Sequence, residues 1–308
     1  MCCLFGIIDY GRNFTGRQLA HILSILSAEC EARGTDATGI AYNSNGHLHI
    51  YKRPLPAHKL RFSIPGDTRV VMGHTRMTTQ GSEKKNFNNH PFKGMAGGMP
   101  FALAHNGVLH NDVLLRREQK LPRTEIETDS YVAVQLIERK KALSLDSLKY
   151  MAEQVEGSFT FTVLDQRDNL YFVKGDNPLC LVHFPKTGVY LYASTEEILG
   201  RALKKLRLPL EKPVRVDASC GDLLKIDRAG AITQGRFDTD NLMRAWYCSS
   251  YWPHGTAAKK GASLEDEYLD ELKSVAGSFG YNPGMIDRLL RQGFTTDEIE
   301  EFLYCGEL

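Results

Sequence analysis

The chain has 308 residues, of which 42% are hydrophobic and 24% are charged. This composition is typical of a globular protein and excludes collagen-like, rod-like coiled-coil and wholly disordered classes. The 38 Lys and Arg residues nearly balance the 37 Asp and Glu residues, so the net charge is +1 and no overall field favours binding to nucleic acid or to an anionic membrane.

The predicted elements begin with a buried strand over Cys3–Asp9, followed by a helix in which apolar residues recur from Leu19 to Leu26. Short strands are expected next, over residues 39–43, 47–52, 69–74 and 101–105. Two helices are predicted over residues 129–139 and 145–155. The later elements are strands at 159–164, 170–173 and 189–193, a helix at 195–206, and strands near 214 and at 223–226. Strands clustered at both ends with helices between them predict an α+β fold of stacked antiparallel sheets covered by helices.

The residue composition of the sequence changes after about residue 245. We expect one domain over residues 1–245, a linker over 246–262 and a small three-helix, partner-binding domain over 263–308. The first 258 residues carry 33 basic and 26 acidic side chains, net +7, whereas the remainder is net −6. The last segment weakly resembles ubiquitin-associated-type three-helix modules. A tail that docks on its own body is the alternative.

Targeting signals and cysteine patterns are also informative. No apolar stretch approaches the roughly 18 residues of a membrane helix, and the first residues lack the basic region of a signal peptide. The seven cysteines are scattered and include no C-x-x-C pair, which argues against a disulfide framework and a zinc ribbon. We therefore expect a cytoplasmic protein with reduced thiols that binds neither membrane nor nucleic acid.

Cys2 directly follows the initiator methionine. Removal of Met1 would leave a thiol and an α-amino group on one residue. Because the amine titrates near roughly 7.7–8.0 and the thiol near roughly 8.5, the amine could act as the base for its own thiol. Position alone favours a simpler interpretation, in which Cys2 is a buried residue that begins a core strand.

Four further segments change that balance: residues 33–41, 73–81, 103–111 and 127–129. Together with Cys2, their order resembles the class II glutamine amidotransferases, the N-terminal-nucleophile domains of glutamine phosphoribosylpyrophosphate amidotransferase, asparagine synthetase B, glutamate synthase and glucosamine-6-phosphate synthase. The likeness to the glutaminase domain of the last enzyme extends over roughly residues 2 to 200. It implies a four-layer αββα sandwich.

The resemblance implies catalytic roles for three residues. Cys2 would be the nucleophile, with its own amine as the base through a water molecule. The side-chain amide of Asn106 and the backbone N–H of Gly107 would form the oxyanion hole. From the residues alone, Asn106-Gly107 is equally a strong turn signal.

The resemblance also implies residues that bind the substrate and support the site. Arg76 would hold the α-carboxylate of glutamine and Asp129 its α-ammonium group, with Thr79 beside them. Arg33, Gly34 and Asp36 would support the N-terminus. Taken singly, Arg76 could belong to a surface ion pair, and Asp129 could cap a helix. The family often has Trp, Ala, Thr and His after the arginine, whereas this chain has Met77, Thr78, Thr79 and Gln80.

Neither a metal nor a cofactor is predicted. His74, His90, His105 and His110 match no compact ligand spacing, and no phosphate-binding loop or dinucleotide fingerprint occurs. The residues after the predicted domain are too few for an isomerase, transferase or synthetase domain. A synthase or transferase subunit in a separate chain would then use the ammonia.

Three functions follow from these observations. The first is a glutaminase that hydrolyses the side-chain amide of glutamine through a γ-glutamyl thioester on Cys2. The second is a stand-alone γ-glutamyl amide hydrolase with the same chemistry and a different γ-glutamyl substrate. The third is an inactive binding or regulatory module that keeps the fold, against which the presence of all the predicted site residues argues.

Overall fold

The computed structural model describes residues 2–208, 211–242, 273, 282, 284–295 and 299. The chain divides into two compact units, Met1–Tyr251 and Trp252–Leu308. In the second unit, the described helix α8 (Gly284–Arg291) buries Ile286 and Leu289, as expected for helical spacing. The predicted linker over 246–262, and most of the predicted three-helix domain over 263–308, lie outside the described residues.

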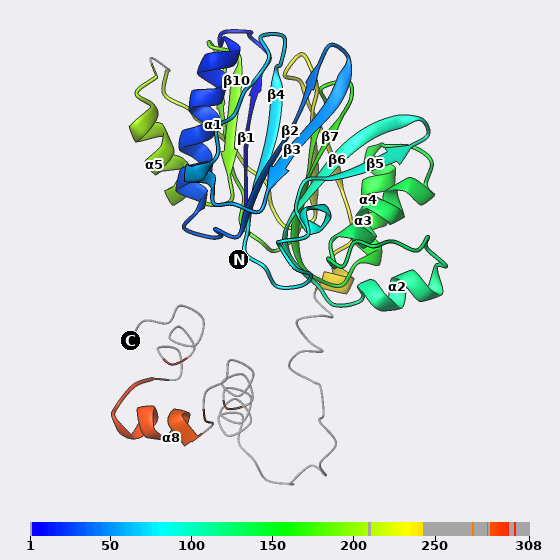
Figure 1. The fold of residues 1–308 in the computed structure, drawn as a ribbon, viewed down its shortest axis with the longest axis vertical. Helices are drawn as coiled ribbons and strands as arrows, with labels where there is room; N and C mark the ends of the chain where they lie inside the picture. The colour runs from blue at the N-terminus through cyan, green and yellow to red at the C-terminus, as the bar shows by residue number, and fades with distance from the viewer. Residues whose placement is uncertain are drawn as a thin grey trace. The chain divides into compact units, whose positions relative to one another are not determined.

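Seven of the described strands of the first unit form one antiparallel sheet. Its order is β11 (Val214–Val216), β9 (Cys180–Phe184), β10 (Val189–Ala193), β1 (Cys3–Asp9), β4 (Val70–Arg76), β2 (Ala37–Ser44) and β3 (His47–Arg53). Helices α1 (Gly16–Cys30) and α5 (Glu196–Leu206) cover its outer face (Figure 1). Helix α1 begins at a capping box between Thr15 and Gln18, which satisfies donors that the first turn leaves unpaired.

Six further described strands form the second antiparallel sheet. Its order is β13 (Ile232–Arg236), β12 (Asp222–Ile226), β8 (Leu170–Lys174), β7 (Gly157–Asp165), β6 (Met99–Leu109) and β5 (Phe92–Ala96). Helices α3 (Tyr131–Arg139) and α4 (Leu145–Gln154) pack on its outer face, with α2 (Asp112–Glu118) beside α3 (Figure 1). Single 3-10 turns at Ala57–Lys59 and Asn86–Asn88 complete the unit as described.

The two sheets pack face to face because their strands are apolar on both sides. In β1, Cys3, Phe5 and Ile7 face the helices, whereas Leu4 and Ile8 face the second sheet, as the two-residue period of a strand requires. The inner layer joins these residues to side chains of the second sheet that include Ala104. The predicted α+β sandwich, with helix, sheet, sheet and helix layers, is confirmed.

Strand β6 is longer than the sequence predicted. It runs to Leu109 and stays paired with β7 through Asn106 and Gly107, so Asn106-Gly107 lies within a strand and the turn interpretation is wrong. Gly107 has a φ of +146°, and a Cβ built there would lie 1.9 Å from the carbonyl oxygen of Ser158. Only glycine fits such a position.

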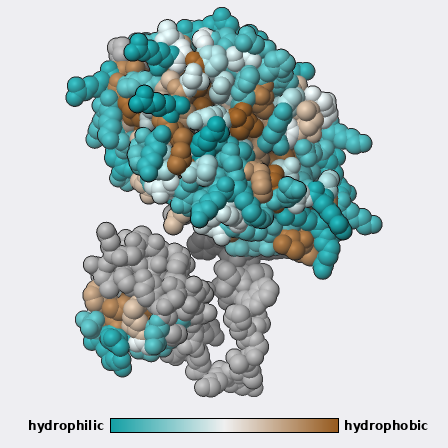
Figure 2. Space-filling view, viewed as in Figure 1, coloured by the Kyte–Doolittle hydropathy of each residue, from teal (hydrophilic) through white to brown (hydrophobic). Residues whose placement is uncertain are grey.

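The face of the first unit seen in Figure 2 is mainly hydrophilic, with separate hydrophobic areas. Its exposed large apolar side chains include Leu55, Met77, Phe87 and Met95. Every helix within the described ranges is too short or too polar to cross a lipid bilayer.

Candidate active site

The register of the first sheet brings three predicted segments to one edge. Strand β1 pairs antiparallel with β4, so that Cys3 lies opposite Thr75, and β2 pairs with β4 so that Ala37 lies opposite Arg76. The start of β1, the end of β4 and the start of β2 therefore meet. Cys2 is buried at this edge, and its thiol lies 3.5 Å from the carbonyl oxygen of Met77.

The predicted supporting residues contact these strand ends. The Nε of Arg33 donates to the carbonyl oxygen of Cys2 at 2.9 Å. A Cβ on Gly34 would lie 2.5 Å from the carbonyl carbon of Arg76, so the two backbones touch. Asp36 donates its backbone N–H to the Arg76 carbonyl at 2.9 Å and accepts from the N–H of Thr78 at 2.7 Å. These contacts fix the backbone around Cys2 and Arg76.

Arg76 is almost completely buried, so it is not part of a surface ion pair. Its Nη1 donates to Asn89 Oδ1 at 2.7 Å, and its Nη2 donates to the carbonyls of Gln80 and Gly81 at 2.5 and 2.9 Å. A guanidinium group has five N–H donors. Nε–H and one N–H of Nη1 are left without a partner among the described residues.

The segment after Arg76 forms the outer part of the site. Met77, the first residue after Arg76, is 51% exposed. Thr79 is exposed, and its side chain makes no hydrogen bond with a described residue. The side of the site formed by Met77 and Thr79 is therefore exposed to solvent.

Asn106, like His90, is a buried polar side chain of the site whose polar atoms lack hydrogen bonds with the described residues. Asn106 is 1% exposed, and neither its Oδ1 nor its Nδ2 has a hydrogen-bond partner within the described part of the chain. Leaving a buried polar group unsatisfied costs about 1–3 kcal/mol. Such a cost is commonly retained where the group has a function in binding or catalysis.

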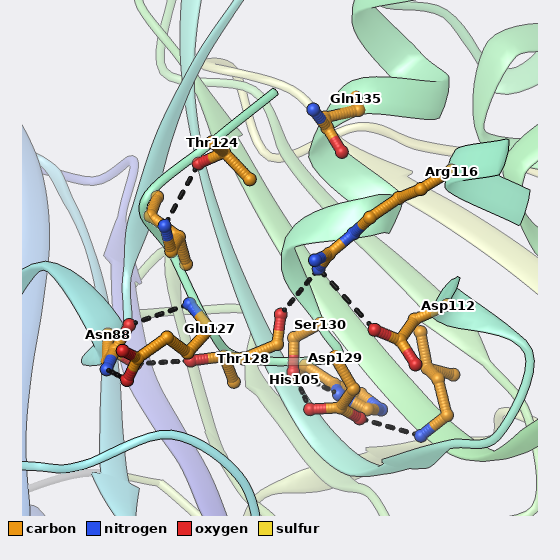
Figure 3. A network of polar contacts seen from close by, with 12 residues as sticks. Asn88, His105, Asp112, Arg116, Thr124, Glu127, Thr128, Asp129, Ser130 and Gln135 are labelled. Carbon is orange, nitrogen blue, oxygen red and sulfur yellow. Dashed lines mark hydrogen bonds and ion pairs between the residues drawn. The ribbon is translucent and has the colours of Figure 1, made fainter. Parts of the chain in front are cut away.

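Asp129 and its neighbours Ser130 and His105 form a hydrogen-bonded network (Figure 3). The Asp129 carboxylate accepts from the N–H of Leu109 at 2.7 Å and from the hydroxyl of Ser130 at 3.3 Å. Ser130 Oγ also lies 2.7 Å from Nδ1 of His105. Because the carboxylate bonds the strand rather than the first turn of α3, Asp129 is not a helix cap.

Three of the four histidines considered above cluster beside the site, whereas His110 is exposed. The rings of His74 and His90 lie 4.3 Å apart, and His74 Nε2 lies 2.9 Å from the carbonyl oxygen of His105. Burial lowers the pKa of His74 to about 3 and also lowers the pKa of His90 and of His105. These rings are neutral near pH 7. The spacing along the sequence gave no sign of this cluster.

Burial raises the pKa of the Cys2 thiol, while its hydrogen bond to Met77 and the charge of Arg76 oppose the shift. The thiol is therefore protonated near neutral pH. A nucleophilic role for Cys2 therefore requires a base. The described histidines of β4 and β6, His74 and His105, are both buried in the cluster described above.

No family model matches the sequence. The chain is similar to glutamine–fructose-6-phosphate aminotransferases. It is 32% identical to that of Bacillus licheniformis over 157 residues, which are 48% of this chain and 26% of the relative. It is 33% identical to that of Chlamydia muridarum over 173 residues, 54% of this chain and 27% of the relative. The chain thus spans about a quarter of the length of these relatives.

Two solved structures share the fold. One is the allosteric regulatory enzyme of purine biosynthesis, with a TM-score of 0.61 and 19% identity over 90% of this chain and 58% of that one. The other is glutamine phosphoribosylpyrophosphate amidotransferase from B. subtilis, with a TM-score of 0.59 and the same identity and coverage. The sequence relatives confirm the predicted resemblance to glutamine amidotransferases, and the two solved structures share the predicted fold.

Proposed function

We propose that the chain hydrolyses the side-chain amide of glutamine through a γ-glutamyl thioester on Cys2, releasing ammonia. The observation that carries this proposal is the buried, unpartnered amide of Asn106. It follows His105 on β6, and the hydrogen bond from His74 to the His105 carbonyl joins this part of β6 to the end of β4. A donor without a partner is thus held close to the edge that bears Cys2.

In the proposed reaction, the Cys2 thiolate attacks the side-chain carbonyl carbon of glutamine and forms a C–S bond. The thiol proton moves to the α-amine of Cys2, which the removal of Met1 exposes. Negative charge on the carbonyl oxygen is stabilised by Nδ2 of Asn106 and the N–H of Gly107. The protonated amine then gives this proton to the nitrogen of the substrate amide, the C–N bond breaks, and ammonia leaves. Water attacks the thioester and releases glutamate and the thiol.

The amino-acid end of glutamine would lie between Asp129 and Arg76. The Asp129 carboxylate is buried and accepts two hydrogen bonds, which leaves lone pairs for an ammonium group. Arg76 retains the Nε and Nη1 donors named above for a carboxylate. Thr79, on the exposed segment that follows Arg76, would also bind the substrate.

A second candidate is a γ-glutamyl amide hydrolase that accepts a larger substrate. The exposed Met77 and Thr79 favour it, because the wall where an indole often stands is open. An acceptor-using synthase or transferase in a separate chain and a cytoplasmic location stay predictions, as does the absence of a metal or cofactor.

A substrate panel tests the proposed function. We expect purified chain to release ammonia from glutamine, with asparagine turned over far more slowly because its amide carbon falls one methylene short of Cys2. Glutamate and ammonia are measured in the same reaction and should appear in equal amounts. If γ-glutamyl peptides or conjugates are hydrolysed and glutamine is not, the second candidate holds instead.

Arg76→Ala should raise the KM for glutamine by about 10- to 100-fold, the loss typical of a hydrogen bond to a charged group. The control is 4-aminobutanamide, which has the amide and the amine but no carboxylate. We expect the variant and the parent chain to hydrolyse this analogue with similar kcat/KM. If Arg76 serves only to hold residues 80–89, kcat/KM will fall equally for both substrates, and the binding role is wrong.

A further inference from the structure

A cavity lined by arginines lies at the end of the sandwich opposite Cys2. Its volume is about 610 Å³, and its lining includes Tyr10, Arg69, Arg167, Asn169, Asp227 and Arg228. We call it the arginine cavity. None of the residues that the proposed reaction uses lines this cavity.

Strand directions fix this location. Tyr10 follows the last residue of β1, whereas Cys2 precedes its first residue. Arg69 precedes the first residue of β4, whereas Arg76 is its last. Arg167 lies in the turn between β7 and β8, and Arg228 in the turn between β12 and β13, so both sheets contribute. At about 3.3 Å per residue of strand, the cavity and the edge that bears Cys2 are roughly 20 Å apart.

The three guanidinium groups of the cavity lack a hydrogen-bonded or ion-paired partner among the described residues, although Arg228 lies near Asp168, where its charge opposes the rise that burial causes in the pKa of that carboxyl. No hydrogen bond or ion pair joins the side chain of Arg69, Arg167 or Arg228 to that part of the chain. Other arginines of the same unit do have acidic partners, as in the pairs of Arg116 with Asp112 and of Arg201 with Glu29. Gathering three like charges around one cavity is unfavourable unless an anion compensates them.

The acidic groups near the cavity are already engaged by neutral donors. Asp227 Oδ1 accepts from the N–H groups of Ala229 and Ala231 at 2.8 and 2.9 Å, which closes the turn. Asp165, which is 3% exposed, accepts from the N–H groups of Arg167 and Asn169. The lining itself has three positive charges against the carboxylate of Asp227. Asp168, which lies near Arg228, is a second carboxylate beside the cavity, and it accepts a hydrogen bond from Asn43 at 2.9 Å.

We propose that the arginine cavity binds a small phosphorylated compound that carries at least two negative charges. Guanidinium forks match the spacing of phosphate oxygens, and three of them offer more donors than one carboxylate can accept. The volume lies within the roughly 300–1,000 Å³ of small-molecule sites. The ring of Tyr10, fixed by its hydroxyl 2.7 Å from His183 Nε2, supplies a rigid face for the rest of the ligand.

A binding experiment with the full chain tests this proposal. Pyrophosphate is titrated by calorimetry at a constant ionic strength near 0.15 M, so that general screening is equal throughout. The double variant Arg167→Gln/Arg228→Gln removes two exposed arginines of the cavity. The matched control, Arg17→Gln/Arg61→Gln, removes two exposed arginines elsewhere that also have no ion pair with a described residue.

We expect one pyrophosphate to bind per chain, and the cavity variant to weaken the affinity by about 10- to 100-fold or more. The control variant should keep the parent affinity, and succinate, a dicarboxylate, should bind far more weakly than pyrophosphate. No saturable binding, an equal loss in both variants, or equal affinity for succinate would each overturn the proposal. Binding requires no turnover, so the Cys2→Ser chain should bind pyrophosphate like the parent.

Discussion

Cys2→Ser should lower glutamine turnover by at least about 1,000-fold, the scale on which enzymes lose rate when a covalent nucleophile is removed. A serine hydroxyl is a much poorer nucleophile than a thiolate with an amine as its base. Burial already raises the pKa of the Cys2 thiol, so the site depends on that base to form the nucleophile. Ammonia release at saturating glutamine measures the effect.

Cys3→Ser is the matched control, since it makes the same change one residue away. Cys3 is completely buried, and its thiol lies 3.0 Å from that of Cys30, on the face of β1 that packs against the helices. We expect this variant to lose stability and to keep most of its kcat. Comparable loss of kcat from both substitutions would mean that Cys2 is not the nucleophile.

The mechanism also requires a free amine on Cys2. We therefore expect intact-mass analysis of an active preparation to show chains that begin at Cys2. A fully active preparation in which every chain retains Met1 would rule out the amine as the base. Activity that falls in proportion to the retained Met1 would support it.

The sequence predicted the layers of the fold because the signals for them are local. The buried strand over Cys3–Asp9 and the capped helix that ends at Leu206 appear at nearly their predicted bounds. Asn106-Gly107 was ambiguous because a local turn signal competed with pairing to a strand some 50 residues away. Pairing with β7 decides the outcome, and no local pattern reports it.

The candidate site shows the same limit. Motif order pointed to Arg76, but not to the carbonyls of Gln80 and Gly81 that occupy its Nη2. The contact between the tilted rings of His74 and His90, and the cavity that contains Arg69, arise where distant segments meet. Spacing along the chain cannot reveal such groups, because the register of two separate sheets creates them. Which of these residues act in catalysis stays a prediction.

Asn106→Ala should lower kcat by about 100- to 1,000-fold while the KM for glutamine changes little, because the negative oxygen exists only along the reaction path. The stability of the Asn106→Ala variant, in contrast to its kcat, should not fall. The Asn106 amide has no hydrogen bond to lose with any residue that the structure describes, and removing an unsatisfied buried amide relieves its desolvation cost. We expect the variant to unfold at the same denaturant concentration as the parent chain or at a higher one.

Asn111→Ala provides the opposite case on the same segment. Asn111 is also buried, but its Nδ2 donates to the carbonyl of Gln154 at 2.9 Å and its Oδ1 accepts from the N–H of Glu156 at 3.0 Å. Removing it should cost about 1–3 kcal/mol of unfolding free energy and leave kcat nearly unchanged. Urea unfolding and steady-state kinetics on the two variants separate these effects. If Asn106→Ala destabilises the fold and loses kcat only in proportion to the folded fraction, Asn106 is a structural residue and the oxyanion assignment is wrong.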